Sequence, residues 1–163
     1  MIDLDTLKSA LEYNSDTGDF IWISPTGYRV KPGQKAGCIR PVGYVYVCIG
    51  GKCYLGHRLA WFYQTGSWPD CHIDHVNGVR SDNRWANIRS ATRAENQRNR
   101  GRPANNTSGY KGVSWYARKQ KWRARLVCEG VESHLGYFDN IEDARSAYSK
   151  AASTLHGEFA RVA

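Results

Sequence analysis

Two adjacent residues, Asp74 and His75, and two later asparagines, Asn87 and Asn96, have the side chains of a metal-assisted hydrolytic site. Carboxylate and amide oxygens are the ligands that Mg²⁺-like ions prefer, and few protein ligands suffice where phosphate and water oxygens complete the shell. An imidazole that does not bind the metal titrates near neutral pH and can take a proton from water. We therefore predict that Asp74 and Asn96 bind a divalent cation and that His75 is the general base. Asn87 completes the catalytic set as the residue that ties the intervening loop in place.

Short elements are expected to bring these distant residues together. His72 to His75 has the pattern of a short strand, and Ile88-Arg89 of a second one. Thr92-Arg93-Ala94-Glu95 is typical of a capping box, so we expect a helix to begin at Thr92. Asn96 then lies in the first turn of this helix, where its side chain can face back across a ββα hairpin.

Three nearby residues have weaker cases for a role in the chemistry. His72 alternates with Asp74 along the predicted strand, and Cys71 beside it invites a metal-ligand interpretation. A structural or phosphate-contacting role is the better interpretation, so His72 stays outside the metal set. Arg93 and Arg98 are candidate phosphate contacts, although arginines are common on helix surfaces of any basic protein.

The positive charge of the chain is concentrated in one segment. The net charge is +8, and residues 89–125 contain eleven Lys and Arg against Glu95 alone. A charge excess confined to one segment indicates a surface that faces a polyanion. Aromatic residues stand between these bases, which favours nucleic acid over a merely solvated basic face.

Composition also limits the class and compartment of the protein. The chain has no long apolar run, so we expect no membrane span, and its first residues lack the pattern of a secretory signal. Its five cysteines are an odd number without paired C-x-x-C spacing, which argues against a structural zinc and against a full disulfide framework. We therefore expect inert or partly buried thiols and a cytoplasmic location, in the host cell if a phage encodes the protein.

The residues before the candidate site predict a small α+β platform. Leu4, Leu7 and Leu11 have helical spacing, and a strand is expected at residues 20–23. Residues 44–55 predict a hairpin that turns at Gly50-Gly51, and residues 57–64 a short amphipathic helix.

The residues after position 106 predict a second domain. Strands are expected at residues 110–116, 121–128 and 131–137, and a helix follows Asn140 and ends at Gly157. In the middle strand, alternation places Arg123 and Arg125 on the face opposite Trp122, Ala124 and Leu126. An apolar face for the helix and a basic face for nucleic acid follow from this pattern. Residues 99–106 are basic and rich in helix breakers, as a linker would be.

Residues 70–98 resemble the HNH, or ββα-metal, endonuclease family, in the subgroup where the last histidine is replaced by asparagine. The resemblance is carried by Asp74-His75, Asp82-Asn83-Arg84, Asn87-Ile88-Arg89 and Glu95-Asn96. It implies a DNA endonuclease of the type common among phage-borne and homing enzymes, with His75 as base and Asp74 and Asn96 at the metal. His57-Arg58-Leu59 also resembles the segment that precedes the site in this subgroup.

The third section resembles the AP2 DNA-binding domain. The matching runs are Ser108-Gly109-Tyr110-Lys111-Gly112-Val113, Trp122-Arg123-Ala124, Leu135-Gly136-Tyr137-Phe138 and His156-Gly157-Glu158-Phe159-Ala160. The resemblance implies a three-stranded sheet in the DNA major groove and places Lys111, Ser114, Tyr116, Arg125 and His134 at contact positions. Arg118 and Arg123 are added from the basic face alone.

Together these patterns predict an α+β protein with an HNH domain at 1–98, a basic linker at 99–106 and an AP2-like domain at 107–163. We expect a monomeric endonuclease acting on double-stranded DNA, with Mg²⁺ as the cofactor, Mn²⁺ as its substitute and no structural zinc. The enzyme could cut one strand or both. One alternative is a non-catalytic, sequence-specific DNA-binding regulator, and a weaker one is an RNA substrate.

Overall fold

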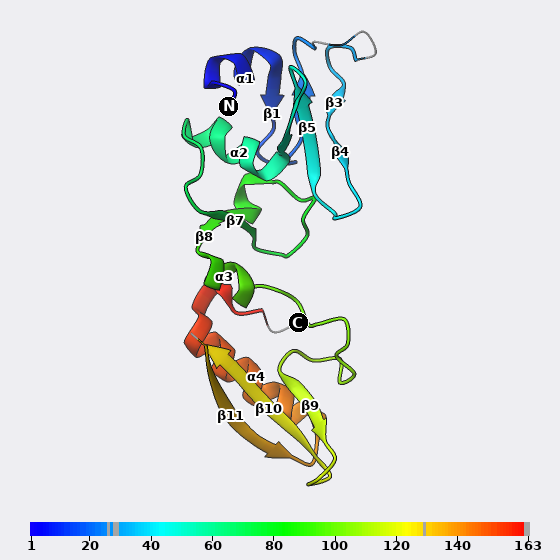
Figure 1. The fold of residues 1–163 in the computed structure, drawn as a ribbon, viewed down its shortest axis with the longest axis vertical. Helices are drawn as coiled ribbons and strands as arrows, with labels where there is room; N and C mark the ends of the chain where they lie inside the picture. The colour runs from blue at the N-terminus through cyan, green and yellow to red at the C-terminus, as the bar shows by residue number, and fades with distance from the viewer. Residues whose placement is uncertain (26, 28–29, 129, 162–163) are drawn as a thin grey trace. The chain divides into compact units, whose positions relative to one another are not determined.

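The computed structural model describes residues 1–25, 27, 30–128 and 130–161 of the chain. These residues form an α+β fold of small antiparallel sheets and short helices, which confirms the predicted class (Figure 1). The elements are α1 (Leu4–Ala10), β1 (Leu11–Tyr13), β2 (Phe20–Trp22), β3 (Lys35–Ala36), β4 (Cys38–Ile39), β5 (Val45–Ile49), β6 (Lys52–Leu55), α2 (Gly56–Thr65), β7 (His72–His75), η1 (Trp85–Asn87), β8 (Ile88–Ala91), α3 (Arg93–Arg98), β9 (Val113–Tyr116), β10 (Lys121–Cys128), β11 (Val131–Phe138), α4 (Ile141–His156) and η2 (Gly157–Phe159).

The chain forms two compact units, Met1–Thr92 and Arg93–Ala163, and each is described by itself. This grouping assigns α3 to the C-terminal unit, whereas the predicted boundary followed the motif and kept α3 with the N-terminal domain. Compactness and motif extent are different criteria, so the predicted boundaries stay a prediction. No helix in the described part of the chain is both long and apolar enough to cross a membrane.

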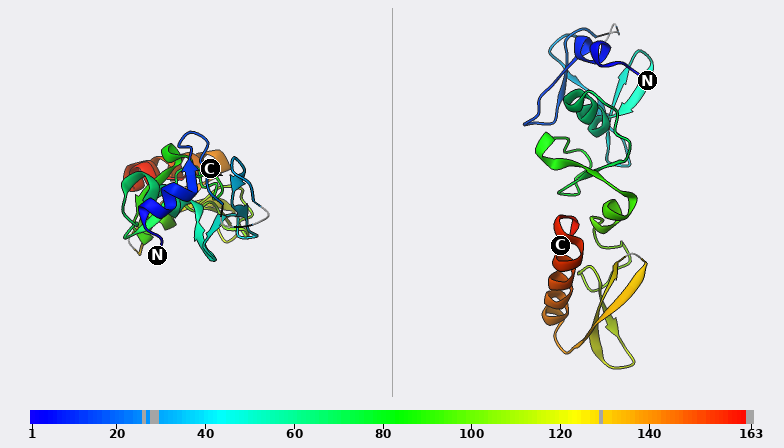
Figure 2. Two further views of the ribbon diagram at one scale, coloured as in Figure 1. Left: turned by 90° about the horizontal axis from the view of Figure 1, so that it is seen from above. Right: turned by 90° about the vertical axis from the view of Figure 1, so that its left-hand side faces the viewer.

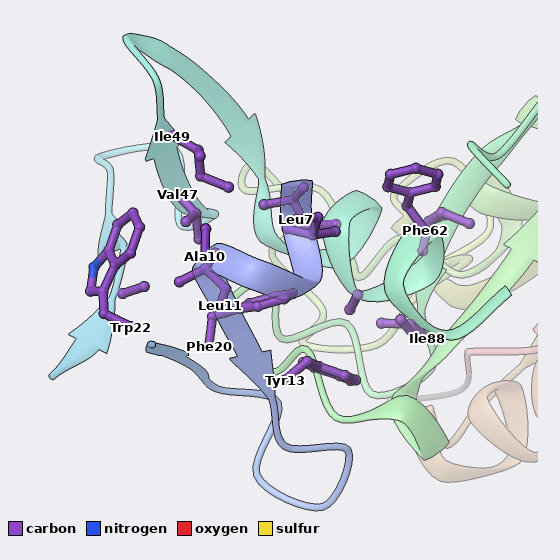
Figure 3. Close-up of a cluster of buried hydrophobic side chains, with 14 residues drawn as sticks. Leu7, Ala10, Leu11, Tyr13, Phe20, Trp22, Val47, Ile49, Phe62 and Ile88 are labelled. Carbon is purple, nitrogen blue, oxygen red and sulfur yellow. The ribbon is translucent and has the colours of Figure 1, made fainter. Parts of the chain in front are cut away.

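The N-terminal unit is built on two three-stranded sheets, with strand orders β1-β2-β3 and β4-β5-β6, and on the two-stranded hairpin β7-β8. Its core is contributed by α1, α2 and the inner faces of these strands. Figure 3 shows Ala10, Leu11, Phe20 and Val47 gathered between α1 and the strands that follow it. Each large side chain buried here stabilises the fold by about 1.5–3 kcal/mol. Ile73 of β7 and Ile88 of β8 belong to this core and so anchor the hairpin to it.

The hairpin β5-β6 turns at Gly50 and Gly51, which both have positive φ, as predicted. Cys48 and Cys53 face each other across its two strands and form a disulfide. The expectation of inert thiols is therefore wrong for this pair. A count of cysteines cannot reveal that a tight hairpin places two of them at opposite positions. The other three are free, with Cys38 and Cys71 exposed.

The C-terminal unit contains the predicted three-stranded meander, with β10 between β9 and β11 and all neighbours antiparallel. Helix α4 lies along one face of this sheet, as the views in Figures 1 and 2 show. Ala144, Tyr148 and Ala152 of α4 pack there against Ala124 and Leu126 of β10. The small alanines let the helix lie close to the sheet, and the opposite face of β10 carries its arginines.

Two predicted boundaries differ from the structure, one because of strand pairing and one because of a turn. Leu11 was expected on the first helix but is the first residue of β1, with extended backbone angles and a pairing to Trp22. Leu7 and Leu11 are both buried in the same core, so their spacing reflects burial and not a continuous helix. The strand expected from Tyr110 begins at Val113 instead, because Gly109 and Gly112 have positive φ. The Ser108 hydroxyl bonds to the carbonyl oxygens of Tyr110 and Val113 in this turn.

Candidate active site

His75, the predicted general base, is a buried residue at the end of β7. Its Nε2 lies 3.2 Å from Oδ1 of Asn83, so the imidazole is fixed in orientation by a buried amide. Burial lowers the pKa of His75 below its usual value, and the Asn83 bond opposes this shift. The imidazole is therefore neutral at pH 7, and the neutral form is the one that can accept a proton.

Asp74, the predicted metal ligand before it, is also buried and forms an ion pair with Arg89. Nε and a terminal nitrogen of Arg89 each donate to Oδ2 of Asp74 at 3.0 Å. The two residues are opposite each other in the β7-β8 register, so the pair follows directly from strand pairing. Arg89 balances the charge of a carboxylate that is only 5% exposed and fixes its orientation.

Asn87 ends the short helix η1 and spans the loop that follows β7. Its side-chain oxygen accepts the backbone N–H of Asn77 at 3.0 Å, and its side-chain nitrogen donates to the carbonyl oxygen of Asp82 at 2.7 Å. These two bonds tie both halves of the loop together. They are the contacts of a residue that holds a loop.

Asn83 is a residue of the site to which the sequence assigned no individual role. It is almost fully buried, and its carbonyl oxygen accepts the Tyr13 hydroxyl at 2.6 Å. Gly18 and Gly56 pack against Asn83 so closely that neither position has room for a side chain. A Cβ at Gly18 would lie 2.5 Å from the Asn83 carbonyl carbon, and a Cβ at Gly56 would lie 2.7 Å from the side-chain amide nitrogen of Asn83. Gly18 also has a φ of +77°, which favours glycine. Only its place in the Asp82-Asn83-Arg84 run of the motif could have drawn attention to it.

Two aromatic rings stand beside His75. His57 of α2 meets it edge to face with 5.0 Å between ring centroids, and Tyr44 lies 6.0 Å from it and 5.2 Å from His57. Burial is the main reason that the pKa of His57 is lowered to about 3, with His75 and Arg58 adding to the effect. His57 is therefore a neutral side chain that lines the site. The family resemblance implies that His57-Arg58-Leu59 packs or contacts DNA, and His57 itself packs against His75.

Asn96, Arg93 and Arg98 lie on α3, which is part of the C-terminal unit. Lys111 holds the end of this helix, since its Nζ donates to the carbonyl oxygens of Arg98 at 2.5 Å and Arg100 at 2.7 Å. Burial lowers the pKa of Lys111. Predicted as a DNA contact, Lys111 here makes the contacts of a helix-capping residue.

The other predicted contact residues of the strands share one face of the C-terminal sheet. Strand register places Arg123 opposite Ser114 and Tyr137, and Arg125 opposite His134. The Arg123 guanidinium lies 5.3 Å from the Tyr116 ring, whose centroid is 5.3 Å from that of Tyr137. Arg118 is exposed in the turn between β9 and β10. This face combines arginines with the tilted ring pair of Tyr116 and Tyr137.

The Asp74 carboxylate is an oxygen donor of the kind that a hard divalent cation prefers. Within the described ranges, no three His, Cys, Asp or Glu side chains form a group that could hold a metal ion. The predicted pair, Asp74 and Asn96, consists of oxygen donors, which suit Mg²⁺ or Mn²⁺ rather than zinc. Arg89 orients the Asp74 carboxylate in the way that outer-shell partners orient metal ligands.

Comparison with known proteins relates the central segment of the chain to a nuclease family. Residues 54–98, from β6 to α3, match the family model of the HNH endonuclease. The chain is 34% identical to Protein 3.8 of Escherichia phage T7 over 64% of its own length and 87% of that protein. It is 28% identical to an uncharacterized HNH endonuclease of Acanthamoeba polyphaga mimivirus, over 95% of this chain and 90% of the relative. No solved structure matches the chain significantly. The family match covers β7, the Asn87 loop and β8, where the buried polar residues lie, so residues 54–98 contain an HNH endonuclease domain.

Proposed function

We propose that this protein is a metal-dependent DNA endonuclease in which His75 activates water and the C-terminal sheet supplies DNA affinity. The observation that carries the proposal is a pair of consecutive buried residues on β7. The Asp74 carboxylate is paired with Arg89, and the neutral His75 imidazole is bonded to Asn83. Burying polar groups costs free energy unless they are bonded. A catalytic role best explains why both groups stay buried and oriented within the matched nuclease segment.

The chemistry assigned to these residues is phosphodiester hydrolysis. His75 accepts a proton from water, the water oxygen forms a bond to phosphorus, and the bond from phosphorus to the 3′ oxygen breaks. A divalent cation held by Asp74 and Asn96, most simply Mg²⁺ with Mn²⁺ as a substitute, would neutralise charge on the phosphate and the departing oxygen. Asn83 and Asn87 keep the imidazole and its loop in place throughout.

The targeting part of the proposal rests on the sheet β11-β10-β9. Its exposed face carries Arg123, Arg125, Tyr116 and His134, and the C-terminal unit has 13 Lys and Arg against seven acids. We assign double-stranded DNA as its ligand, through an AP2-like placement of the sheet in the major groove. A monomer acting in the cytoplasm, with a homing or nicking activity, completes the proposal. Phosphate contacts make affinity fall steeply with salt.

A plasmid-cleavage assay tests the nuclease function. Supercoiled plasmid should be converted to nicked or linear DNA in Mg²⁺ and left intact in EDTA. His75→Ala should reduce the rate on the order of 10²–10⁴-fold, while DNA binding in EDTA persists. His72→Ala is the matched control, because His72 is the exposed histidine of the same strand and is neither base nor metal ligand, so its loss should reduce the rate far less than the loss of His75.

Two results would reject the proposal. Equal cutting by the wild type and His75→Ala would remove the base assignment. Sequence-specific binding that is indifferent to Mg²⁺, with no strand breaks under any condition, would favour a non-catalytic regulator instead.

A further inference from the structure

The loop after β7 carries an arginine that the assigned roles leave unused. Arg80 is exposed, and its guanidinium is held by two neutral contacts. A terminal nitrogen donates to the carbonyl oxygen of Val42 at 2.8 Å, and the guanidinium lies 5.0 Å from the centroid of the Tyr44 ring. These contacts restrict the position of the side chain without neutralising its charge.

The neighbouring arginines of the same unit are engaged differently. Arg89 is paired with Asp74, and Arg84 donates to both carboxylate oxygens of Asp82 at 2.8 and 2.6 Å. Arg58 is half-buried and donates to the carbonyl oxygen of Pro69. Within the described part of the chain, Arg80 has no carboxylate partner. Its positive charge is therefore available to an anion from outside the protein.

Arg80 also lies on the side of the unit where His75 is. The Arg80 guanidinium lies over the Tyr44 ring, and the same ring is a neighbour of His75 and His57. A phosphate bound by Arg80 would consequently be close to the base.

We propose that Arg80 is a substrate-contacting residue that binds a DNA backbone phosphate beside His75. Its planar fork of N–H donors matches two phosphate oxygens, and one terminal nitrogen is already anchored on Val42. The Tyr44 ring and the Val42 carbonyl thus form a seat that holds the guanidinium in place before DNA arrives. This inference rests on the proposed nuclease function for its catalytic consequence, but the phosphate contact itself can be measured without cleavage.

The test compares Arg80→Gln with Arg40→Gln in the full-length protein. Arg40 is a matched control, because it is also an exposed arginine over a tyrosine ring, 4.2 Å from the centroid of Tyr46. Affinity for a short DNA duplex is measured in EDTA at several salt concentrations, and single-turnover cleavage is measured in Mg²⁺. Thermal melts check that both variants are folded.

Arg80→Gln should lower the slope of log affinity against log salt by about one and the cleavage rate on the order of 10- to 100-fold beyond the change in affinity. Arg40→Gln should change the cleavage rate less than about threefold. Arg80→Lys keeps the charge but loses the fork, so its slope should match the wild type while its cleavage rate is intermediate.

Three outcomes would overturn the proposal. An unchanged salt slope in Arg80→Gln would remove the phosphate contact, and an unchanged cleavage rate with a lower slope would place that phosphate away from His75. Equal losses in the Arg40 and Arg80 variants would reduce the effect to general surface charge. If the wild type does not cut DNA but only Arg80→Gln lowers the slope, the phosphate contact stands and the nuclease proposal fails.

Discussion

The two units of this protein place their polar residues in opposite ways. The N-terminal unit buries the polar groups of its candidate site, His57, Asp74, His75, Asn83 and Asn87. The C-terminal unit buries few polar side chains and leaves its arginines exposed or half-buried on the sheet.

The difference teaches how each unit should respond to change. A buried polar group that loses its partner costs the full desolvation of the remaining group, so single changes in the N-terminal unit should have large effects. An exposed cation is screened by solvent and salt, so changes on the C-terminal sheet should be graded and additive. The predictions below test this contrast.

The largest effect is expected from the Asp74–Arg89 pair. Asp74→Asn leaves the guanidinium of Arg89, which is 14% exposed, facing an uncharged amide. We expect a loss of about 3–5 kcal/mol in the free energy of unfolding, as for other broken buried pairs. Chemical denaturation of Asp74→Asn, Arg89→Met and the double variant measures the coupling. If the losses of the two single variants simply add in the double variant, the pair is not the unit that stabilises the hairpin.

A smaller effect is expected from the bond that orients His75. Asn83→Ala removes the acceptor of the imidazole Nε2 and should lower the free energy of unfolding by about 1–3 kcal/mol. It should also slow DNA cleavage, because the base is no longer fixed. Asn83→Asp retains an acceptor oxygen and should recover part of the rate. Wild-type cleavage by Asn83→Ala would show that the bond has no part in positioning the base.

The pH dependence of stability should report the burial of His57. Its pKa is about 3 in the folded protein against 6.5 for the free side chain. The unfolded chain therefore binds a proton between these values that the folded chain does not. Stability from this group is complete above pH 6.5 and falls by about 1.4 kcal/mol for each pH unit as the pH decreases towards 3. His57→Phe should flatten this acid limb in denaturation curves, and an unchanged slope would contradict the assignment.

The smallest effects are expected on the C-terminal sheet. Arg125 is exposed and forms an ion pair with Glu132 at 2.9 Å. Arg125→Gln should change the free energy of unfolding by less than about 0.5 kcal/mol and lower the salt slope of DNA binding by about one. Lys150→Gln is the control, because Lys150 is exposed on α4, on the opposite side of the sheet. A loss of stability as large as that of Asn83→Ala would break the contrast between the units.

Local patterns predicted most of the elements because they depend on neighbours in sequence. The strand at His72–His75, the hairpin turn at Gly50-Gly51 and the cap of α4 at Asn140 all follow from the residues themselves. The failures occurred where the pairing of two strands decided the outcome. Leu11 joins a strand because Trp22 pairs with it, and Cys48 meets Cys53 because of hairpin register.

The sequence by itself determined the chemical character of this protein: the Asp74-His75 pair, the Asn87 loop and the basic alternation of β10 are all legible in order along the chain. Only the tertiary structure revealed that Asn83 orients His75, that Arg89 neutralises Asp74, and that Lys111 caps a helix. The physical reason is that residue types fix which bonds are available, whereas burial and packing decide which of them form. A lysine has the same charge in sequence wherever it lies, and its contacts decide whether that charge faces DNA or a carbonyl.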